Sequence, residues 1–247
     1  MAKIITKPSA LRREYVLLLK RIRRALIFAV IFVLTAIGGS VVMNIERMFG
    51  LGLVLLGVSA VGFIISIIVA SMRHTDATVI KTGIVGENTT AHILSSLPKG
   101  YFVFLNLVIE CDGKKSELDT VVVGPSGIYI VETKNRKGLI KGNYDSERWT
   151  QTKIGRGGTA YSTDFYSPVK QVGTHVFRLA RYLRQNGAAT HISGIVYFTG
   201  TQEIEITGRE GQIPVISDSS QLKRCLMKQK ANLEPDFISK ICKLLSK

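Results

Sequence analysis

The chain has 247 residues, a formal net charge of +15 and a hydrophobic content of 46%, with a mean hydropathy of +0.21. This length suits one ordinary domain with an additional segment, and the hydropathy is high for a soluble protein. The three cysteines, Cys111, Cys225 and Cys242, show no CxxC or Cys/His ligand spacing. The composition therefore excludes a disulfide framework and a zinc site.

Two uncharged segments near the N-terminus account for the hydropathy. They cover residues 25–45 and 48–72, and only Glu46 and Arg47 separate them. About 20 helical residues cross a hydrocarbon core of roughly 30 Å. A signal peptide is the alternative for the first segment, but its apolar region would span only about 7–15 residues. We therefore expect a two-helix transmembrane hairpin over 25–72 that anchors the chain in the lipid bilayer.

The residues before this hairpin are strongly basic. Residues 1–24 contain eight Lys or Arg side chains and one Glu, whereas the connection between the two spans is neutral. The positive-inside rule then predicts that this basic leader lies in the cytoplasm. Two spans return the chain to the same side, so both termini and a domain at 76–247 are expected to be cytoplasmic, at the cell membrane. The further positive charge suits either nucleic acid or a membrane surface.

The remaining sequence predicts one α/β domain. A helix is expected at 82–97 and a loop at 155–166, and Pro168 opens a helix that Asn186-Gly187 ends. Strands are expected at 101–109, 117–123, 128–134, 191–198 and 213–216, and helices at 168–185, 219–230 and 235–245. This order indicates a mixed sheet with helices on its faces.

The hairpin formed by the second and third strands carries the chemistry. Its turn, Gly124-Pro125-Ser126-Gly127, pairs residues whose numbers add to 251, so Asp119 would face Glu132 with Cβ atoms roughly 4.5–5.5 Å apart. Lys134 would project from the same face as Glu132. Facing carboxylates repel each other, and a divalent cation with hard oxygen ligands would offset that repulsion. The alternative is a solvated strand face with a weak Glu–Lys pair.

Several motifs in order extend this pattern. They are the run LDTVVVGPSGIYIVETKNRKG (118–138), Gly86-Glu87, a lone Trp149 and the segment Ser167–Val172. Over about 82–185 the chain resembles the nuclease-related domain (NERD) family of the PD-(D/E)XK nuclease superfamily. The resemblance implies a restriction-endonuclease-like mixed sheet flanked by helices. The chain departs from the family pattern at Thr120, where many relatives have histidine, and at Ser167, where asparagine is frequent.

The resemblance also implies roles for individual residues. Asp119 and Glu132 would hold Mg²⁺ or Mn²⁺, with Glu87 as a third carboxylate. Lys134 would orient the attacking water or stabilise charge on the scissile phosphate, and Gln171 would support it. From the residues alone, Glu87 is equally a first-turn acid favoured by the helix dipole, and Gln171 a solvated helix residue.

Basic and aromatic residues around and beyond the hairpin are candidates for nucleic-acid contact. They are Lys137, Lys141, Trp149, Lys153 and Arg156. The histidines His92, His175 and His191 show no spacing to a nucleophile, so no catalytic triad is expected.

The sequence therefore predicts a membrane-anchored, metal-dependent nuclease that hydrolyses phosphodiester bonds, in DNA rather than RNA and as an endonuclease rather than an exonuclease. RNA is not excluded. A non-catalytic module that binds nucleic acid or a partner at the membrane is the first alternative. A scaffold with neither metal nor nucleic-acid affinity is the second.

Overall fold

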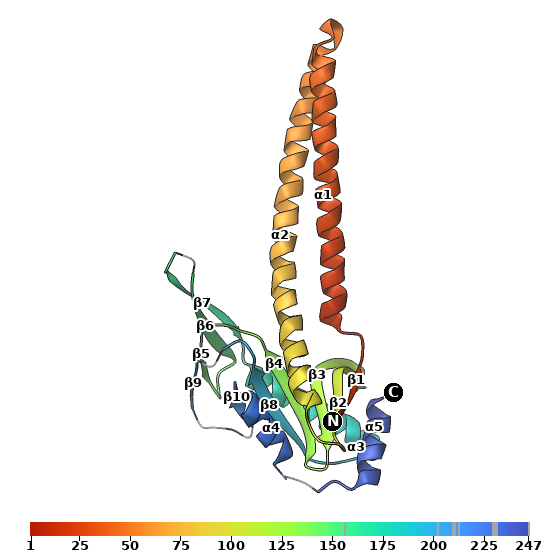
Figure 1. The fold of residues 1–247 in the computed structure, drawn as a ribbon, viewed down its shortest axis with the longest axis vertical. Coiled ribbons are helices and arrows are strands. Elements are labelled where there is room, and N and C mark those ends of the chain that lie inside the picture. Colours follow the sequence, from red (N-terminus) through yellow and green to blue (C-terminus); the bar gives the residue numbers. More distant parts are fainter. Residues whose placement is uncertain (156, 202, 209–210, 212, 229–231, 247) are drawn as a thin grey trace. The chain divides into compact units, whose positions relative to one another are not determined.

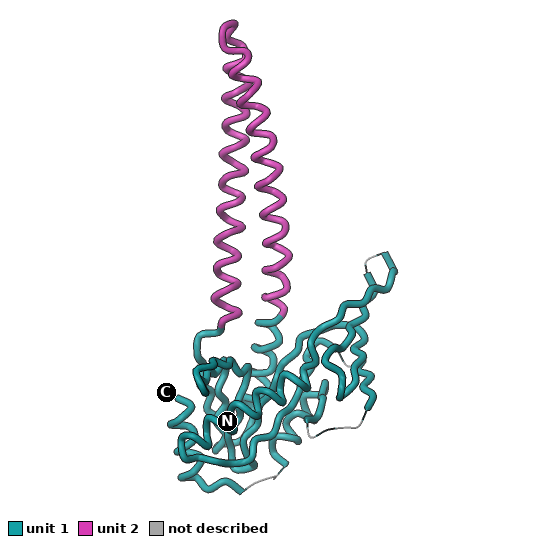
Figure 2. Tube along the Cα trace, turned by 180° about the vertical axis from the view of Figure 1, so that it is seen from behind, with its two compact units in different colours: residues 1–9, 83–247 teal, residues 10–82 magenta. Residues whose placement is uncertain are grey.

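A computed structural model covers residues 1–247 and describes all of them except 156, 202, 209, 210, 212, 229–231 and 247. The chain forms two compact units (Figure 2). One consists of Met1–Ser9 together with Gly83–Lys247, and the other of Ala10–Thr82. Each unit is described by itself.

The unit Ala10–Thr82 is a pair of long helices. It contains α1 (Ala10–Met43), the short 3₁₀ helix η1 (Glu46–Met48) and most of α2 (Phe49–Ser95). Many apolar side chains of both helices face outward. Both helices are long and apolar enough to cross a membrane.

Small residues bring α1 and α2 together. A Cβ atom built on Gly52 would lie 2.7 Å from the carbonyl oxygen of Gly39, so the two backbones touch where only glycine fits. The Thr35 and Ser59 hydroxyls form a hydrogen bond of 2.8 Å nearby. Close approach at small residues and hydrogen bonds between helices are the means by which helices associate in lipid.

The helix expected at 82–97 is not a separate element. It forms the last part of α2, which continues to Ser95. Gly83 and Gly86 cost about 1 kcal/mol each in a helix interior, and there is no proline to force a stop. The prediction that Glu87 occupies a first turn is therefore wrong, because Glu87 lies in the interior of a long helix.

A six-stranded mixed sheet forms the centre of the other unit (Figure 1). Its order is β1-β2-β3-β4-β8-β10, with β2, β3 and β4 antiparallel and the pairs β1–β2, β4–β8 and β8–β10 parallel. The strands are β1 (Lys3–Thr6), β2 (Phe102–Cys111), β3 (Lys114–Gly124), β4 (Gly127–Lys134), β8 (Ile192–Phe198) and β10 (Val215–Ile216). This mixed sheet confirms the predicted fold class.

Helices cover both faces of this sheet. Val121 and Ile130 pack with α3 (Pro168–Gln185) and α5 (Pro235–Leu245). Their neighbours Val122 and Tyr129 pack on the other face with the end of α2 and with α4 (Ser219–Met227). Because side chains alternate along a strand, β3 and β4 are apolar on both faces. Residue 119 lies two positions from Val121 on β3, and residues 132 and 134 lie two and four positions from Ile130 on β4. Their side chains are therefore on the face of the sheet that α3 covers.

A second, four-stranded sheet was not predicted. Its order is β7-β6-β5-β9, with β5 (Leu139–Asn143), β6 (Arg148–Ile154), β7 (Ala160–Tyr166) and β9 (Ile204–Thr207). The expected loop at 155–166 is wrong from Ala160 onward, because β7 pairs with β6 over its whole length. This sheet has its own core, in which Trp149 and Phe165 pack on Val172 of α3 and Phe198 of β8.

Candidate active site

The site lies where β3 and β4 separate. The observed pairs Gly124–Gly127 and Thr120–Val131 confirm the predicted register. Among the described residues, pairing of β3 with β4 ends there, and β4 continues against β8 through Lys134. The Thr133 backbone N–H donates instead to Asp119 Oδ2 at 3.2 Å. Asp119 therefore satisfies a backbone donor that the ladder leaves open.

The neighbouring strand is also irregular at this level. Ladder pairs of β2 with β3 are formed by Leu105 with Thr120 and by Leu107 with Leu118, and the intervening Asn106 and Asp119 are not paired. Asn106 has a positive φ of 55°, which asparagine adopts more readily than most residues. The sheet is thus locally open on both sides of Asp119.

Lys134 connects two polar side chains. Its Nζ donates to Glu132 Oε1 at 2.7 Å and to Gln171 Oε1 on α3 at 2.9 Å. The Glu132 side chain is only 1% exposed, whereas that of Lys134 is 23% exposed. The structure therefore brings together Glu132, Lys134 and Gln171, as the sequence predicted, and leaves the lysine accessible.

His175 is a member of this cluster that the sequence analysis did not assign. Its Nδ1 lies 3.4 Å from Glu132 Oε2, which is close enough for an ion pair. Neither atom has a hydrogen-bond partner among the described residues. His175 follows Gln171 by four positions, so both lie on one face of α3. That spacing was the signal available in the sequence.

The two carboxyl groups have opposite pKa shifts. The pKa of Asp119 is raised from 3.8 to about 8, by burial first and then by the charges of Glu132 and Glu87, against the opposing effects of Lys134 and the Thr133 N–H. Burial also disfavours ionised Glu132, but His175 and Lys134 outweigh it and lower the pKa of Glu132. The pair therefore holds one stable negative charge and a second that a cation or a proton must compensate.

The end of α2 supports the opposite side of β4. The Thr133 hydroxyl donates to Thr90 Oγ1 at 2.9 Å, and a Cβ on Gly86 would lie 2.7 Å from Asn135 Cβ. Glu87 thus comes from the helix on the face opposite α3. Its charge affects Asp119, but the described residues contain no group of three or more His, Cys, Asp or Glu side chains able to hold a metal. The structure does not bring Glu87 in as a third ligand.

The predicted nucleic-acid contacts differ in exposure. Trp149 is 1% exposed and its indole N–H donates to the Asn143 carbonyl oxygen at 3.0 Å, so it is a core residue and the expected base stacking is wrong. Lys137 and Lys141 are exposed, and Lys141 pairs with Glu205 at 3.0 Å. Lys153 is half-buried on β6. Arg156 lies outside the described residues.

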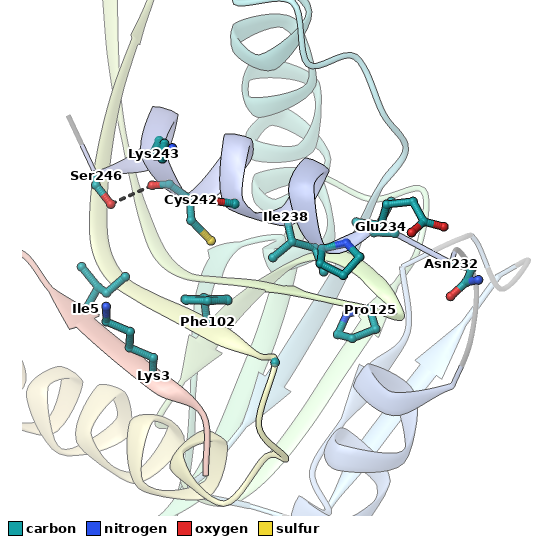
Figure 3. A pocket seen from close by; sticks show the side chains of 14 residues that line it. Lys3, Ile5, Phe102, Pro125, Asn232, Glu234, Ile238, Cys242, Lys243 and Ser246 are labelled. Atoms are coloured by element: carbon teal, nitrogen blue, oxygen red, sulfur yellow. Dashed lines mark hydrogen bonds between the residues drawn. The ribbon is translucent and has the colours of Figure 1, made fainter.

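A cavity of about 800 Å³ lies elsewhere, between the β1–β2 edge and α5 (Figure 3). Ile5, Phe102, Ile238 and Cys242 are among its lining residues. It contains none of the predicted catalytic residues, so it does not belong to the site at the separation of β3 and β4.

Comparisons with known proteins agree with this arrangement. The family model of the nuclease-related domain matches residues 82–199. An uncharacterized protein of Bacillus anthracis is 34% identical over 92 residues, which are 36% of this chain and 43% of that protein's length. No solved structure matches. Residues 82–199, which contain the whole cluster, are therefore a nuclease-related domain.

Proposed function

We propose that this chain is a membrane-anchored, divalent-metal-dependent nuclease that hydrolyses phosphodiester bonds within DNA. The observation that carries the proposal is the cluster of Asp119, Glu132 and Lys134 at the separation of two strands. A carboxylate pair beside a partly exposed lysine is costly to bury. Perturbed pKa values at such a point are typical of functional sites.

The residues present fit a hard divalent cation. Glu132 Oε2 is buried without a hydrogen-bond partner among the described residues, and burial together with the charge of Glu132 raises the pKa of Asp119. Mg²⁺ typically binds one or two protein carboxylates and completes its coordination with water and substrate phosphate oxygens. In this proposal Asp119 and Glu132 hold Mg²⁺ or Mn²⁺. A bound ion of this kind lowers the pKa of a coordinated water and neutralises charge on a phosphoryl oxygen.

The chain's own groups position the reactants. Lys134 presents an ammonium group to the scissile phosphate or the attacking water, and Gln171 and Glu132 fix its direction through two hydrogen bonds. A fixed cation where negative charge develops stabilises the transition state without reorganisation. From α3, His175 Nδ1 lies 3.4 Å from the second oxygen of Glu132, while Lys134 contacts the first oxygen.

The helical pair is proposed to anchor this domain, with both termini in the cytoplasm. The excess of basic residues before the first span supports this orientation. A C-terminal tag should be digested by protease in inside-out membrane vesicles and protected in sealed cells. Digestion in sealed cells with protection in inside-out vesicles would contradict the orientation.

The test of hydrolysis uses the full chain in detergent micelles with supercoiled plasmid DNA. We expect conversion to nicked or linear DNA in Mg²⁺ or Mn²⁺, none in EDTA, and a loss of at least about a hundredfold in Lys134→Ala, the scale of one lost transition-state donor. Lys115→Ala, an exposed lysine on β3, is the matched control and should retain the wild-type rate.

If a folded wild-type chain cleaves neither DNA nor RNA with any divalent metal, the enzymatic proposal fails. DNA binding that persists in EDTA would then favour the alternative, a non-catalytic module held at the membrane. Binding of neither metal nor nucleic acid would favour a scaffold.

A further inference from the structure

Arg136 is a half-buried cation that the proposed chemistry does not use. It follows Lys134 by two residues, at the point where β4 ends and the chain turns toward the second sheet. Its Nη1 donates to Gln151 Oε1 at 2.7 Å, and its guanidinium carbon lies 4.0 Å from the centre of the Phe165 ring. Both partners are neutral side chains of the β6–β7 hairpin.

The charge of Arg136 is not compensated by the described residues. None of their carboxylates lies within ion-pair distance of its guanidinium. Burial lowers the pKa of the side chain, which reflects the cost of removing the charge from water. Enclosed charges in proteins are normally paired. A half-buried guanidinium held rigidly by neutral groups is therefore arranged for an anion from outside the chain.

The support for this geometry is itself fixed. Gln151 is 2% exposed, and while its Oε1 accepts from Arg136, its Nε2 donates to the Lys137 carbonyl oxygen at 2.7 Å. The amide therefore has one orientation, and it offers oxygen to the guanidinium. Phe165 is buried in the core between the second sheet, α3 and β8. The guanidinium is thus held on two sides before any ligand binds, which reduces the entropy lost on binding.

Arg136 and Lys134 are each linked to the N-terminal part of α3 through a different neighbour. Lys134 contacts Gln171 directly, and Phe165 beneath Arg136 packs in one cluster with Val169 and Val172 of α3. Two residues of extended chain span at most about 7 Å, which is comparable to the step between neighbouring phosphates of one nucleic-acid strand. A polyanion whose reacting phosphate is at Lys134 would place its next phosphate within reach of Arg136.

We propose that Arg136 binds the phosphate adjacent to the scissile one, held in place by Gln151 and Phe165. The ligand is a nucleic-acid backbone, because its charges repeat along the strand. A guanidinium suits this role because its planar fork donates two parallel hydrogen bonds to a phosphate. This inference rests on the proposed function and names a further contact of the same site.

The test measures binding without cleavage. Fluorescence anisotropy of a fluorescein-labelled DNA duplex and of its single strand is recorded with the full chain in detergent and EDTA, over a series of salt concentrations. Arg136→Gln should weaken binding about tenfold and reduce the slope of log K against log salt by about 1. Arg136→Lys should retain the slope and recover part of the affinity, because it keeps the charge but not the fork.

A second variant tests the same contact with Arg136 intact. Gln151→Glu places a carboxylate against the guanidinium and should weaken DNA binding as much as Arg136→Gln does. A purely structural Arg136 predicts no such loss, since the new ion pair would hold the side chain in place. Arg148→Gln, an exposed arginine on β6 whose side chain lies on the other face from Gln151, is the control and should bind as wild type. Fluorescence of the buried Trp149 reports whether each variant is folded.

The outcomes separate this inference from the proposed function. Unchanged affinity and slope in folded Arg136→Gln and Gln151→Glu, with a wild type that binds DNA, overturn the role of Arg136 alone. Weakened binding in both variants without any cleavage by the wild type in Mn²⁺ supports the role of Arg136 and overturns hydrolysis. A wild type that binds no nucleic acid overturns both.

Discussion

The two ends of the β3–β4 pair differ although the same two strands form them. At the turn, Val123 faces Ile128 and both are buried in an apolar core with every backbone pair in register. Beyond the Thr120–Val131 pair the β3–β4 ladder stops, and Asp119, Glu132 and Lys134 lie there instead. The first end stabilises the sheet. At the open end the backbone pairs are absent and like charges lie together. Functional sites often have such features at the expense of stability.

Truncation at the turn end should give the largest loss of stability. Ile128→Ala removes a side chain that is 1% exposed and should reduce the free energy of unfolding by about 2–5 kcal/mol. Thermal unfolding followed by Trp149 fluorescence measures this, with Ile128→Val expected to cost about 0.5–1.5 kcal/mol. Below its unfolding temperature the Ala variant should bind Mn²⁺ as the wild type does. A change in Mn²⁺ affinity would show that the two ends are not independent.

Removing the charge of Asp119 at the open end should change the free energy of unfolding by less than Ile128→Ala does, and should increase it. The pKa of Asp119 is raised from 3.8 to about 8 in the fold, so the folded state holds a proton that the unfolded chain has lost. Stability should therefore fall as the pH rises from about 4 to about 8. Glu132, whose pKa is lowered in the fold, has the opposite effect: its contribution to stability is lost as the pH falls.

Asp119→Asn stays neutral and should lack that decline. In EDTA at pH 8 it should unfold at a higher temperature than the wild type, while near pH 4 the two should be similar. Glu110→Gln, an exposed carboxylate on β2, is the control and should leave the pH profile unchanged. A steeper decline in Asp119→Asn than in the wild type would contradict the electrostatic account.

The sequence predicted the elements whose signals are local. Gly124-Pro125-Ser126-Gly127 determined the register of the hairpin, and Pro168 with Asn186-Gly187 correctly bounded α3 at Pro168–Gln185. The contact of Lys134 with Gln171 follows once strand and helix pack together. Two long apolar segments were equally visible, because hydropathy depends on composition rather than on tertiary contacts.

The parts that were missed depend on distant partners. β5, β6, β7 and β9 are short and carry glycine, threonine and charged residues, so their pairing relies on the Trp149 core. β5 also pairs with β9, whose residues lie 64 positions later in the chain. β1 forms only by parallel pairing with β2, far along the chain. His175 lies beside Glu132 only because α3 packs on the sheet. Trp149 was predicted to stack on bases, but it is buried in the core of the second sheet.

The most direct test of the metal site is calorimetric titration of Mn²⁺ into the full chain at pH 8. The account predicts binding by the wild type and loss of that binding in both Asp119→Asn and Glu132→Gln, with Glu110→Gln unaffected. Mn²⁺ binding that survives in both variants, or that is absent from a folded wild type, would contradict the claim that the open end of β3 and β4 is a metal-dependent site.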